Sequence, residues 1–513
     1  MATSTGYHHP FTSGDLTTVN NRDIDSDCYV EEDVLRTTFA LSMSAMYTAE
    51  VPLYGDLVQI VRNINQSKLP SATETERLSL ERHGAIRLGT NQELQTVHRI
   101  FNLVGMHPVG YYDLSVAGLP MHATCFRPVD GLSLQKNPFR VFTTLLRPDL
   151  LRSDDAKSVA LSLLRHRRIF SDELMRLLDV AESQGNRLTK SQAETYIIQV
   201  LRSFSWHSTA AANYEQYQLL KSEHPILADI ACFRSAHINH LTPRTLDITE
   251  AQSAMLQAKM AVKSRIEGPP RRKCPILLRQ TSFLALEEKI HFPSSSSFYD
   301  ATLLRDPNDA TPLIEGSHKA RFGEIEERGA AVTPKGRQLY DRLLELVMQK
   351  ARSSDTAATV DPHTIDKIME DCFQVYPDDW DELRKQGLVY YEYRINMSQN
   401  TMMRRNAQAT FTSNSFDCRS TSLESLICEG IIEAVPITYE DFLPFSAAGI
   451  FQSNLGSNKN DKSATERNEL NACPDLEGFE RALGTQVLDP DVLYAGMQKR
   501  SLERCATVLG IRI

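Results

Sequence analysis

The chain has 513 residues, 41% of them apolar and 24% charged, which is the usage of an ordinary globular protein with room for one large or about three average domains. Its 56 Lys and Arg against 65 Asp and Glu give a formal charge of -9, which provides no overall field to attract nucleic acid or an anionic membrane. No apolar run approaches the roughly 18 residues that a membrane-spanning helix needs. We therefore expect no nucleic-acid partner and no membrane partner.

The amino-terminal third predicts helices, then a strand, a helix and several strands. Leu35, Phe39 and Met43 recur every four residues and build an apolar stripe, whereas Arg82–Gly89 is punctuated by glycines that disfavour a helix. Later apolar runs alternate with turn residues, as strands joined by short connections do. The expected elements are helices at 31–46, 57–64 and 91–104 and strands at 82–89, 109–114, 121–126 and 139–145.

The pattern then changes to long amphipathic helices over 153–223, which we interpret as a helical insertion or cap. Further strands are expected at 228–240, 275–281, 320–327 and 389–394, and a helix at 336–350. No internal repeat is visible. We expect a single large domain over 29–513 that carries this insertion.

Nine cysteines are scattered along the chain without a CxxC pair, and such an odd, dispersed set favours reduced thiols in an intracellular protein. Residues 1–28 lack both the layout of a secretory signal and the Arg-rich pattern of a mitochondrial presequence, so we interpret them as a polar, mobile tail. The sequence predicts a cytoplasmic protein, and import into an organelle stays open.

Common nucleotide, zincin and serine-hydrolase motifs are missing: there is no GxGxxG after a strand, no GxxxxGK[ST], no HExxH and no GxSxG. Three polar clusters within strand-like sequence remain as candidates. In the first, His83 and Arg87 stand four residues apart and share a face whether the segment is a strand or a helix. The alternative interpretation of this pair is a solvated edge.

The second cluster is the segment 236–247, which contains two histidines. If the segment is extended, His237 and Asn239 share one face while Ile238 and His240 share the other, so only one histidine faces a given pocket. A core histidine bonded to a backbone carbonyl is the alternative interpretation.

The third cluster places Glu324 and Glu326 on one face of a strand, where two carboxylates repel each other unless a cation or a proton lies between them. A bound metal would relieve this repulsion, and an acidic strand edge balanced by Arg321 and Arg328 is the alternative. Together the clusters offer two imidazoles and a carboxylate, the facial set that binds Fe(II) and leaves positions open for substrate and oxygen. The sequence therefore predicts a non-haem iron centre.

At this point a family resemblance becomes visible, and it extends from about Val34 to Leu509. The chain resembles the 2-oxoadipate dioxygenase/decarboxylase family in the segments HGAIR (83–87), HINHLTPR (237–244), RFGEIE (321–326), EDFLP (440–444) and SAAGIFQS (446–453). The resemblance implies an α+β, vicinal-oxygen-chelate-like fold, in which a curved mixed sheet built from βαβββ units surrounds a metal and carries a large helical elaboration. It also implies conversion of 2-oxoadipate and O2 to 2-hydroxyglutarate and CO2 in lysine catabolism.

The same resemblance assigns roles to single residues. It implies His83 and His237 as Fe(2+) ligands, Glu324 as the carboxylate ligand, and Arg87 as the partner of the substrate's carboxylate. Arginine suits that task because its planar fork can hold a carboxylate bidentately. The 2-oxo dicarboxylic acid would chelate iron through its ketone and adjacent carboxylate, in contact with both histidines, and O2 would take the last open position.

Several alternatives stay open at single positions. Glu326 shares a face with Glu324, which leaves a shift of the ligand by two residues possible, and His122 is a candidate for an outer group that orients a ligand. The family uses the segment of Phe445 and Ser446 near the substrate, and Phe445 stands where a smaller aliphatic residue is expected. A narrower pocket there would alter the preferred length of the oxo acid.

Two rival functions remain at the level of the sequence. One is a metal-dependent isomerase or lyase of the same superfold, because fold does not fix function and similar ligand sets hold other divalent ions. The other is a non-catalytic metabolite-binding protein that keeps the pocket without turnover. Consumption of oxygen would separate the dioxygenase from both.

Overall fold

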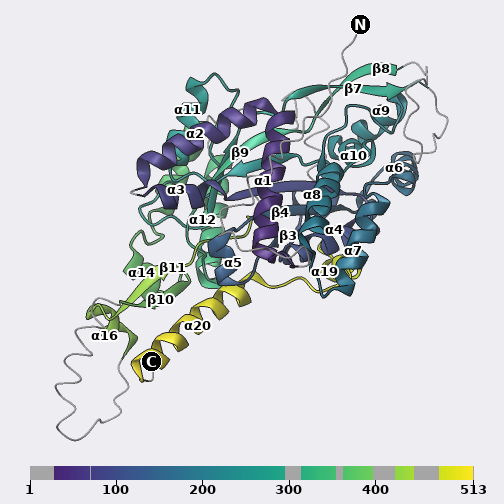
Figure 1. Ribbon diagram of the computed structural model, residues 1–513. Coiled ribbons are helices and arrows are strands. Elements are labelled where there is room, and N and C mark those ends of the chain that lie inside the picture. The colour runs from purple at the N-terminus through teal and green to yellow at the C-terminus, as the bar shows by residue number, and fades with distance from the viewer. Residues whose placement is uncertain are drawn as a thin grey trace, which may run out of the picture.

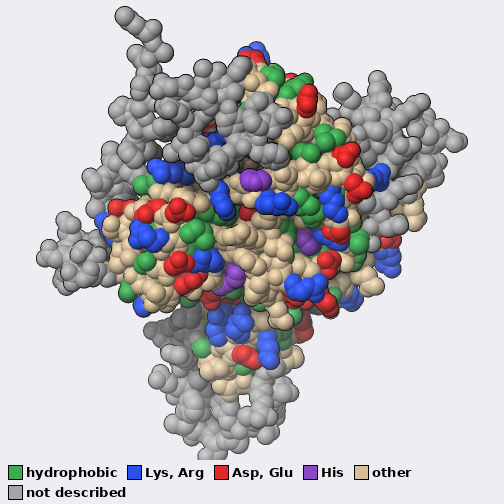
Figure 2. Space-filling model, turned by 90° about the vertical axis from the view of Figure 1, so that its right-hand side faces the viewer, with side chains coloured by type: hydrophobic (Ala, Val, Ile, Leu, Met, Phe, Trp, Pro, Cys, Tyr) green, Lys and Arg blue, Asp and Glu red, His purple; other side chains and the backbone are tan. Residues whose placement is uncertain are grey.

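The computed structural model describes residues 28–69, 71–294, 313–353, 362–396, 422–443 and 473–511. Residues 1–27 of the expected tail therefore lie outside the described part of the chain. None of the helices in the described part of the chain is both long and apolar enough to cross a membrane. On the face seen in Figure 2, Lys and Arg side chains lie interspersed with Asp and Glu.

A seven-stranded mixed sheet lies at the centre of the molecule, in the order β2-β3-β4-β1-β5-β9-β6 (Figure 1). Its strands are β1 (Arg82–Leu88), β2 (His107–Asp113), β3 (Met121–Arg127), β4 (Arg140–Leu146), β5 (His240–Pro243), β6 (Leu278–Ser282) and β9 (Phe322–Arg328). Strand β1 pairs parallel with β4 and antiparallel with β5, and β5 pairs parallel with β9. This order makes β1, β5 and β9 neighbours, although they are far apart in the sequence.

The strand, helix and three strands expected from residue 82 onward are confirmed. Helix α4 (Asn91–Leu103) connects β1 to β2, and β2, β3 and β4 then follow as antiparallel neighbours. Thr90 begins α4 with a capping box, in which its side chain and that of Glu93 satisfy each other's backbone N–H groups. The fold class is α+β with a curled mixed sheet, as the resemblance implies.

One face of the sheet is covered by helices α1 (Glu32–Glu50), α2 (Pro52–Lys68), α4, α7 (Asp172–Ser183) and α8 (Lys190–Phe204). The core between them contains apolar residues of the central strands, among them Ile86, Leu241 and Ile325. Gly84 lies on this face too, and a Cβ there would come within 2.6 Å of the Ile238 side chain, so a larger residue would require that side chain to move. The alternate residues of these strands point to the opposite face.

The opposite face carries helices α6 (Asp154–His166), α9 (Tyr214–Glu223) and α10 (Pro225–Ala231), with a hairpin of β7 (Glu287–Pro293) and β8 (Leu313–Lys319). The stretch expected to be helical, 153–223, thus contains α6 to α9. The strand expected over 228–240 is wrong, because α10 occupies its beginning and extended pairing starts only at His240. A buried helix of seven mostly apolar residues cannot be distinguished from a strand by its periodicity, since both are apolar throughout.

A third apolar cluster lies at the end of the molecule where α20 and the C-terminus appear in Figure 1. It joins α12 (Pro334–Ser353), α13 (Pro362–Phe373), α14 (Trp380–Lys385), α16 (Leu423–Cys428), α20 (Pro490–Leu509) and the hairpin of β10 (Tyr391–Ile395) and β11 (Ile432–Pro436). The remaining helices are α3 (Ala72–Ser79), α5 (Gly131–Lys136), α11 (Ile248–Gln257) and α19 (Leu476–Leu483). This third cluster lies away from β1, β5 and β9, the strands whose polar side chains form the candidate site.

Helix α1 is bonded to the central strands through the hydroxyl of Tyr47. This buried hydroxyl lies 2.8 Å from the carbonyl oxygens of both Asn239 and Phe322, where β5 and β9 begin to pair. We expect Tyr47→Phe to lower the free energy of unfolding in urea by about 0.5–1.5 kcal/mol, because it removes the hydroxyl donor from these carbonyl groups, of which that of Asn239 still accepts from the backbone N–H of Phe322.

The matched control is Tyr214→Phe, which removes the hydroxyl of an exposed tyrosine on α9 and should change the free energy of unfolding by less than about 0.5 kcal/mol. Equal losses in the two variants would contradict the role of the Tyr47 hydroxyl.

Candidate metal centre

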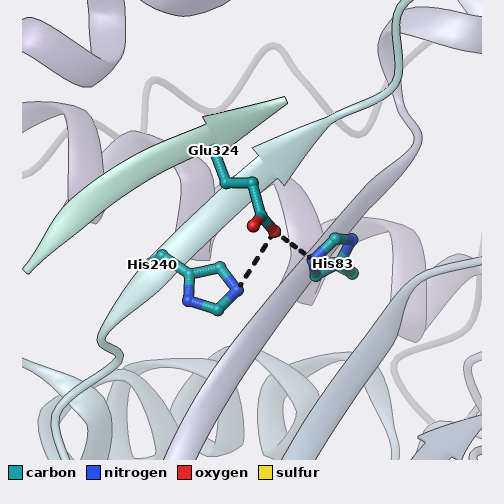
Figure 3. Close-up of side chains that lie close together, drawn as sticks. All are labelled: His83, His240 and Glu324. Carbon is teal, nitrogen blue, oxygen red and sulfur yellow. Dashed lines mark hydrogen bonds and ion pairs between the residues drawn. The ribbon is translucent and has the colours of Figure 1, made fainter. Parts of the chain in front are cut away.

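Three side chains converge from three neighbouring strands: His83 from β1, His240 from β5 and Glu324 from β9 (Figure 3). The Nε2 atoms of His83 and His240 lie 3.1 Å and 3.7 Å from Oε2 of Glu324. The three potential ligand atoms all lie within 4.8 Å of one another, and this is the group of that kind found among the described residues. We refer to it as the triad.

The alternation of side chains along the strands produces the triad. His83 pairs with Thr242 across β1 and β5, and Leu241 pairs with Gly323 across β5 and β9. Since Leu241 faces the apolar core, its neighbours His240 and Thr242 face the other side. On β9 the same alternation places Glu324 on the polar face.

The triad is buried and carries unsatisfied polar atoms. His83 and Glu324 are 0% exposed and His240 is 4% exposed. Within the described part of the chain, Oε1 of Glu324 and Nδ1 of His240 have no hydrogen-bond partner. Burial, with His83 and Arg87 nearby, holds the pKa of His240 well below its ordinary value, so this imidazole is neutral, as a metal ligand must be. Two imidazoles and one buried carboxylate with an unused oxygen fit a divalent metal ion.

The carboxylate of Glu324 is oriented by two neutral donors. The hydroxyl of Thr242 donates to Oε2 at 3.0 Å and the amide of Gln280 donates to the same oxygen at 3.2 Å. Such hydrogen bonds to a ligand carboxylate fix its direction, which is the usual task of the shell around a metal site.

Glu326 lies behind His83 and outside the triad. Its Oε2 is 3.0 Å from Nδ1 of His83, and it forms ion pairs with Arg140 and with Arg328. Burial opposes ionisation, yet Arg140 and His83 hold the pKa of Glu326 well below its ordinary value. An imidazole that binds metal through Nε2 carries its proton on Nδ1, and in that tautomer the Glu326 carboxylate at 3.0 Å would stabilise the proton; Nδ1 of His83 also lies 3.3 Å from a terminal nitrogen of Arg140.

Arg328 continues this chain of charges away from the triad. It forms ion pairs with Glu81 and Glu440 as well as with Glu326. Burial alone would raise the pKa of Glu81, but Arg244 and Arg328 lower it to about 2. The charges behind His83 are therefore paired, which is the condition for burying them.

Arg87 lies on the triad's face of β1, four residues after His83, and is 3% exposed. One of its terminal nitrogens forms an ion pair with Asp229 of α10. The charge of Arg87 contributes to the lowered pKa of His240, as expected for a group that lies near the triad. The face of the sheet that carries two imidazoles and two carboxylates thus also carries a buried guanidinium.

The structure places His237 outside the triad. Its Nε2 lies 3.2 Å from Oδ1 of Asp229, and its ring packs edge-on against Trp206 with centroids 4.6 Å apart. Asp229 is held ionised, with a pKa well below its ordinary value despite burial, because Arg87 and His237 lie against it. The same nitrogen of His237 also lies 3.3 Å from the amide nitrogen of Asn239, so its described contacts are with Asp229 and Asn239. The expected alternation is present, and the histidine at the triad is the one on the other face, His240.

His122 also lies away from the triad. Its ring packs against Phe479 with centroids 4.7 Å apart, and its Nδ1 is 3.5 Å from the hydroxyl of Tyr111. Burial lowers the pKa of His122 to about 4. Phe445 and Ser446, the expected substrate contacts, lie outside the described residues. Phe442, in the described segment just before them, lies close to the triad: its ring centroid is 4.9 Å from that of His83.

Comparison with known proteins identifies the family of the chain. A model of the 2-oxoadipate dioxygenase/decarboxylase family matches residues 39–454. A 2-oxoadipate dioxygenase/decarboxylase of Escherichia coli K12 is 44% identical over 486 residues, which cover 93% of this chain and 98% of that protein. The chain belongs to this family. A relative of the same description from Pseudomonas putida is 42% identical over 493 residues, covering 94% of this chain and 98% of the relative.

Solved structures of the family share the fold. The hydroxyglutarate synthase of Pseudomonas putida in complex with 2-oxoadipate superimposes with a TM-score of 0.79 at 42% identity, covering 94% of this chain and 99% of that one. A structure from Shigella flexneri gives a TM-score of 0.74 at 40% identity. The chain is therefore an enzyme of the 2-oxoadipate dioxygenase/decarboxylase type.

Several residues of the site were not found from the sequence. Glu326 was considered only as a rival ligand, and its role behind His83 depends on Arg140, whose strand is 186 positions away. Asp229 was not considered, because it stands in an apolar helix where an isolated acid gives no pattern. The signal that was available is chemical: a charged residue inside a fully buried apolar run needs a partner.

The assignment of the second imidazole can be tested by a pair of substitutions. We expect His240→Ala to lower the affinity for Fe(II) or Mn(II) by at least about 100-fold, because a facial triad has no spare protein ligand. His237→Ala, the matched control on the same segment, should retain metal within about threefold, since its ring lies outside the triad and its Nε2 contacts Asp229 and Asn239. Titration calorimetry under anaerobic conditions measures both, and metal loss in the His237 variant alone would overturn the assignment.

The role of Glu326 gives a second test. We expect Glu326→Gln to weaken metal binding by roughly 10–100-fold, because it removes the charge that favours the Nδ1 proton of His83. Glu327→Gln is the control, since residue 327 follows on the same strand but pairs with Arg279 on the other side. A Glu326 variant that binds metal as tightly as the control would show that this carboxylate does not act on His83.

Proposed function

We propose that the protein is a non-haem Fe(II) dioxygenase that decarboxylates and hydroxylates 2-oxoadipate with O2, giving 2-hydroxyglutarate and CO2 on a lysine catabolic route. The observation that supports this proposal is the triad of His83, His240 and Glu324, three buried side chains whose potential ligand atoms lie within 4.8 Å of one another. A ferrous ion bound there would supply Lewis acidity and redox chemistry toward O2 at positions that the protein leaves open.

The buried charges of the site support a dicarboxylic 2-oxo acid as substrate. Arg87 is a guanidinium on the same face of β1 as His83, and a guanidinium can hold a carboxylate by two parallel hydrogen bonds. A solved relative with 42% identity is described in complex with 2-oxoadipate. We therefore assign Arg87 to the binding and orientation of a substrate carboxylate.

Aromatic rings line the triad and limit the access of water. The ring of His240 stacks on Phe322 with centroids 4.8 Å apart, and the ring of His83 meets Phe442 edge-on. Excluding water from such a site strengthens the interactions of its charged groups and protects reactive species from side reactions. His83, His240 and Glu324 thus hold the metal, and Arg87 orients the acid in a dry environment.

The deciding experiment is oxygen uptake by protein loaded anaerobically with Fe(II), started by adding 2-oxoadipate. We expect one O2 consumed for each 2-hydroxyglutarate formed, and with 18O2 two labelled atoms in that product, because the reaction leaves both oxygen atoms in the organic acid. Mass spectrometry in the same vessel measures both quantities.

Protein loaded with Zn(II) is the control, since zinc binds similar ligands without redox chemistry and should consume no oxygen. No uptake by protein with verified Fe(II) and bound 2-oxoadipate would contradict the proposed reaction.

A further inference from the structure

The buried carboxylate of Asp229 is contacted by polar groups of four other side chains. It stands on α10 and is 3% exposed. It pairs with Arg87, and it accepts hydrogen bonds from Nε2 of His318 at 2.9 Å and from the amide of Asn239 at 3.3 Å. With His237 at 3.2 Å, both carboxylate oxygens are engaged.

This cluster is not a second metal site. Its carboxylate already holds the guanidinium of Arg87, and among the described residues the close group of potential ligand atoms is the triad. Asp229 is therefore a counter-charge for Arg87. The orientation of Arg87 matters because this residue lies on the same face of β1 as His83.

We infer that Asp229 is a positioning residue that aims Arg87 at the substrate's carboxylate. This inference rests on the proposed function, which gives Arg87 its substrate. An arginine side chain has several rotatable bonds, and binding a carboxylate by two bonds requires its planar fork in one orientation. Asp229 fixes one end of the guanidinium, and a planar group with five N–H donors can contact more than one carboxylate.

The position of Asp229 is in turn fixed from two further elements. His318 lies on β8 and its Nδ1 is 3.0 Å from the hydroxyl of Tyr217 on α9. The ring of Trp206 stacks parallel to that of His318, with centroids 6.2 Å apart and an interplanar angle of 8°. The β7–β8 hairpin and the helices α9 and α10 thus meet at the carboxylate that holds Arg87.

The test is Asp229→Asn, which keeps the size of the side chain and removes its charge. We expect the dissociation constant for 2-oxoadipate, measured anaerobically on metal-loaded protein, to rise at least about tenfold, with KM rising more than kcat falls. Metal affinity should stay within about twofold, because Asp229 does not touch the triad. Asp179→Asn, the same change in an exposed ion pair with Arg99, is the control.

A double-mutant cycle separates positioning from a general effect on the fold. In an Arg87→Ala background, Asp229→Asn should change the affinity for 2-oxoadipate by less than about twofold, because the group that it positions is gone. A milder variant, His318→Phe, keeps an aromatic ring beside Trp206 and should weaken 2-oxoadipate binding by about threefold or more.

Unchanged affinity in the Asp229 variant, a parallel loss of metal, or equal effects in both backgrounds would overturn the inference. Wild-type protein that binds 2-oxoadipate without consuming O2 would refute the proposed reaction and leave the positioning role intact. Wild-type protein that does not bind 2-oxoadipate would overturn both.

Discussion

The structure depends on the burial of two carboxylates on one face of β9. Glu324 and Glu326 are two positions apart and both are almost fully buried, an arrangement that is unfavourable unless each receives its own positive partner. The fold separates these partners. Glu326 is paired with Arg140 and Arg328, whereas among the described residues Glu324 receives neutral donors and the two imidazoles of the triad. The charge of one carboxylate is thereby balanced by arginines, and the other is left for a cation.

The same arginines tie distant parts of the chain to the triad. Arg328 joins Glu326 to Glu440, and the next residue, Asp441, accepts two hydrogen bonds from Arg127 of β3 at 2.7 Å and 3.0 Å. Tyr494 of α20 donates to Asp441 at 2.6 Å. The segment that brings Phe442 against His83 is therefore anchored by charged groups of the sheet and by the C-terminal helix, so the site and the carboxyl-terminal cluster form one bonded unit.

The sequence predicted the parts of this structure that local pattern determines. Strands β1 to β4 and helix α4 follow from alternation and from helical spacing, and the opposite faces of His237 and His240 follow from the geometry of an extended chain. Local pattern does not predict which of these two histidines lies at the triad, because that depends on how the segment pairs with β1 and β9. Asp229 was missed for a related reason, because its four partners come from β1, β8 and the segment before β5. Local pattern gives the face of a residue, and only tertiary pairing gives its neighbours.

The position of β5 between β1 and β9 has a consequence for how the protein matures in the cell. His83 and Glu324 are 241 positions apart, and they meet only after the strands between them have paired. An unfolded or partly synthesised chain therefore presents no complete triad, so a metal ion would enter late and bind the native state alone. A ligand of that kind stabilises the native state by mass action, by about 2.7 kcal/mol when its free concentration is 100 times the dissociation constant. A metal ion bound at the triad would then contribute to the stability of the folded protein as well as to its activity.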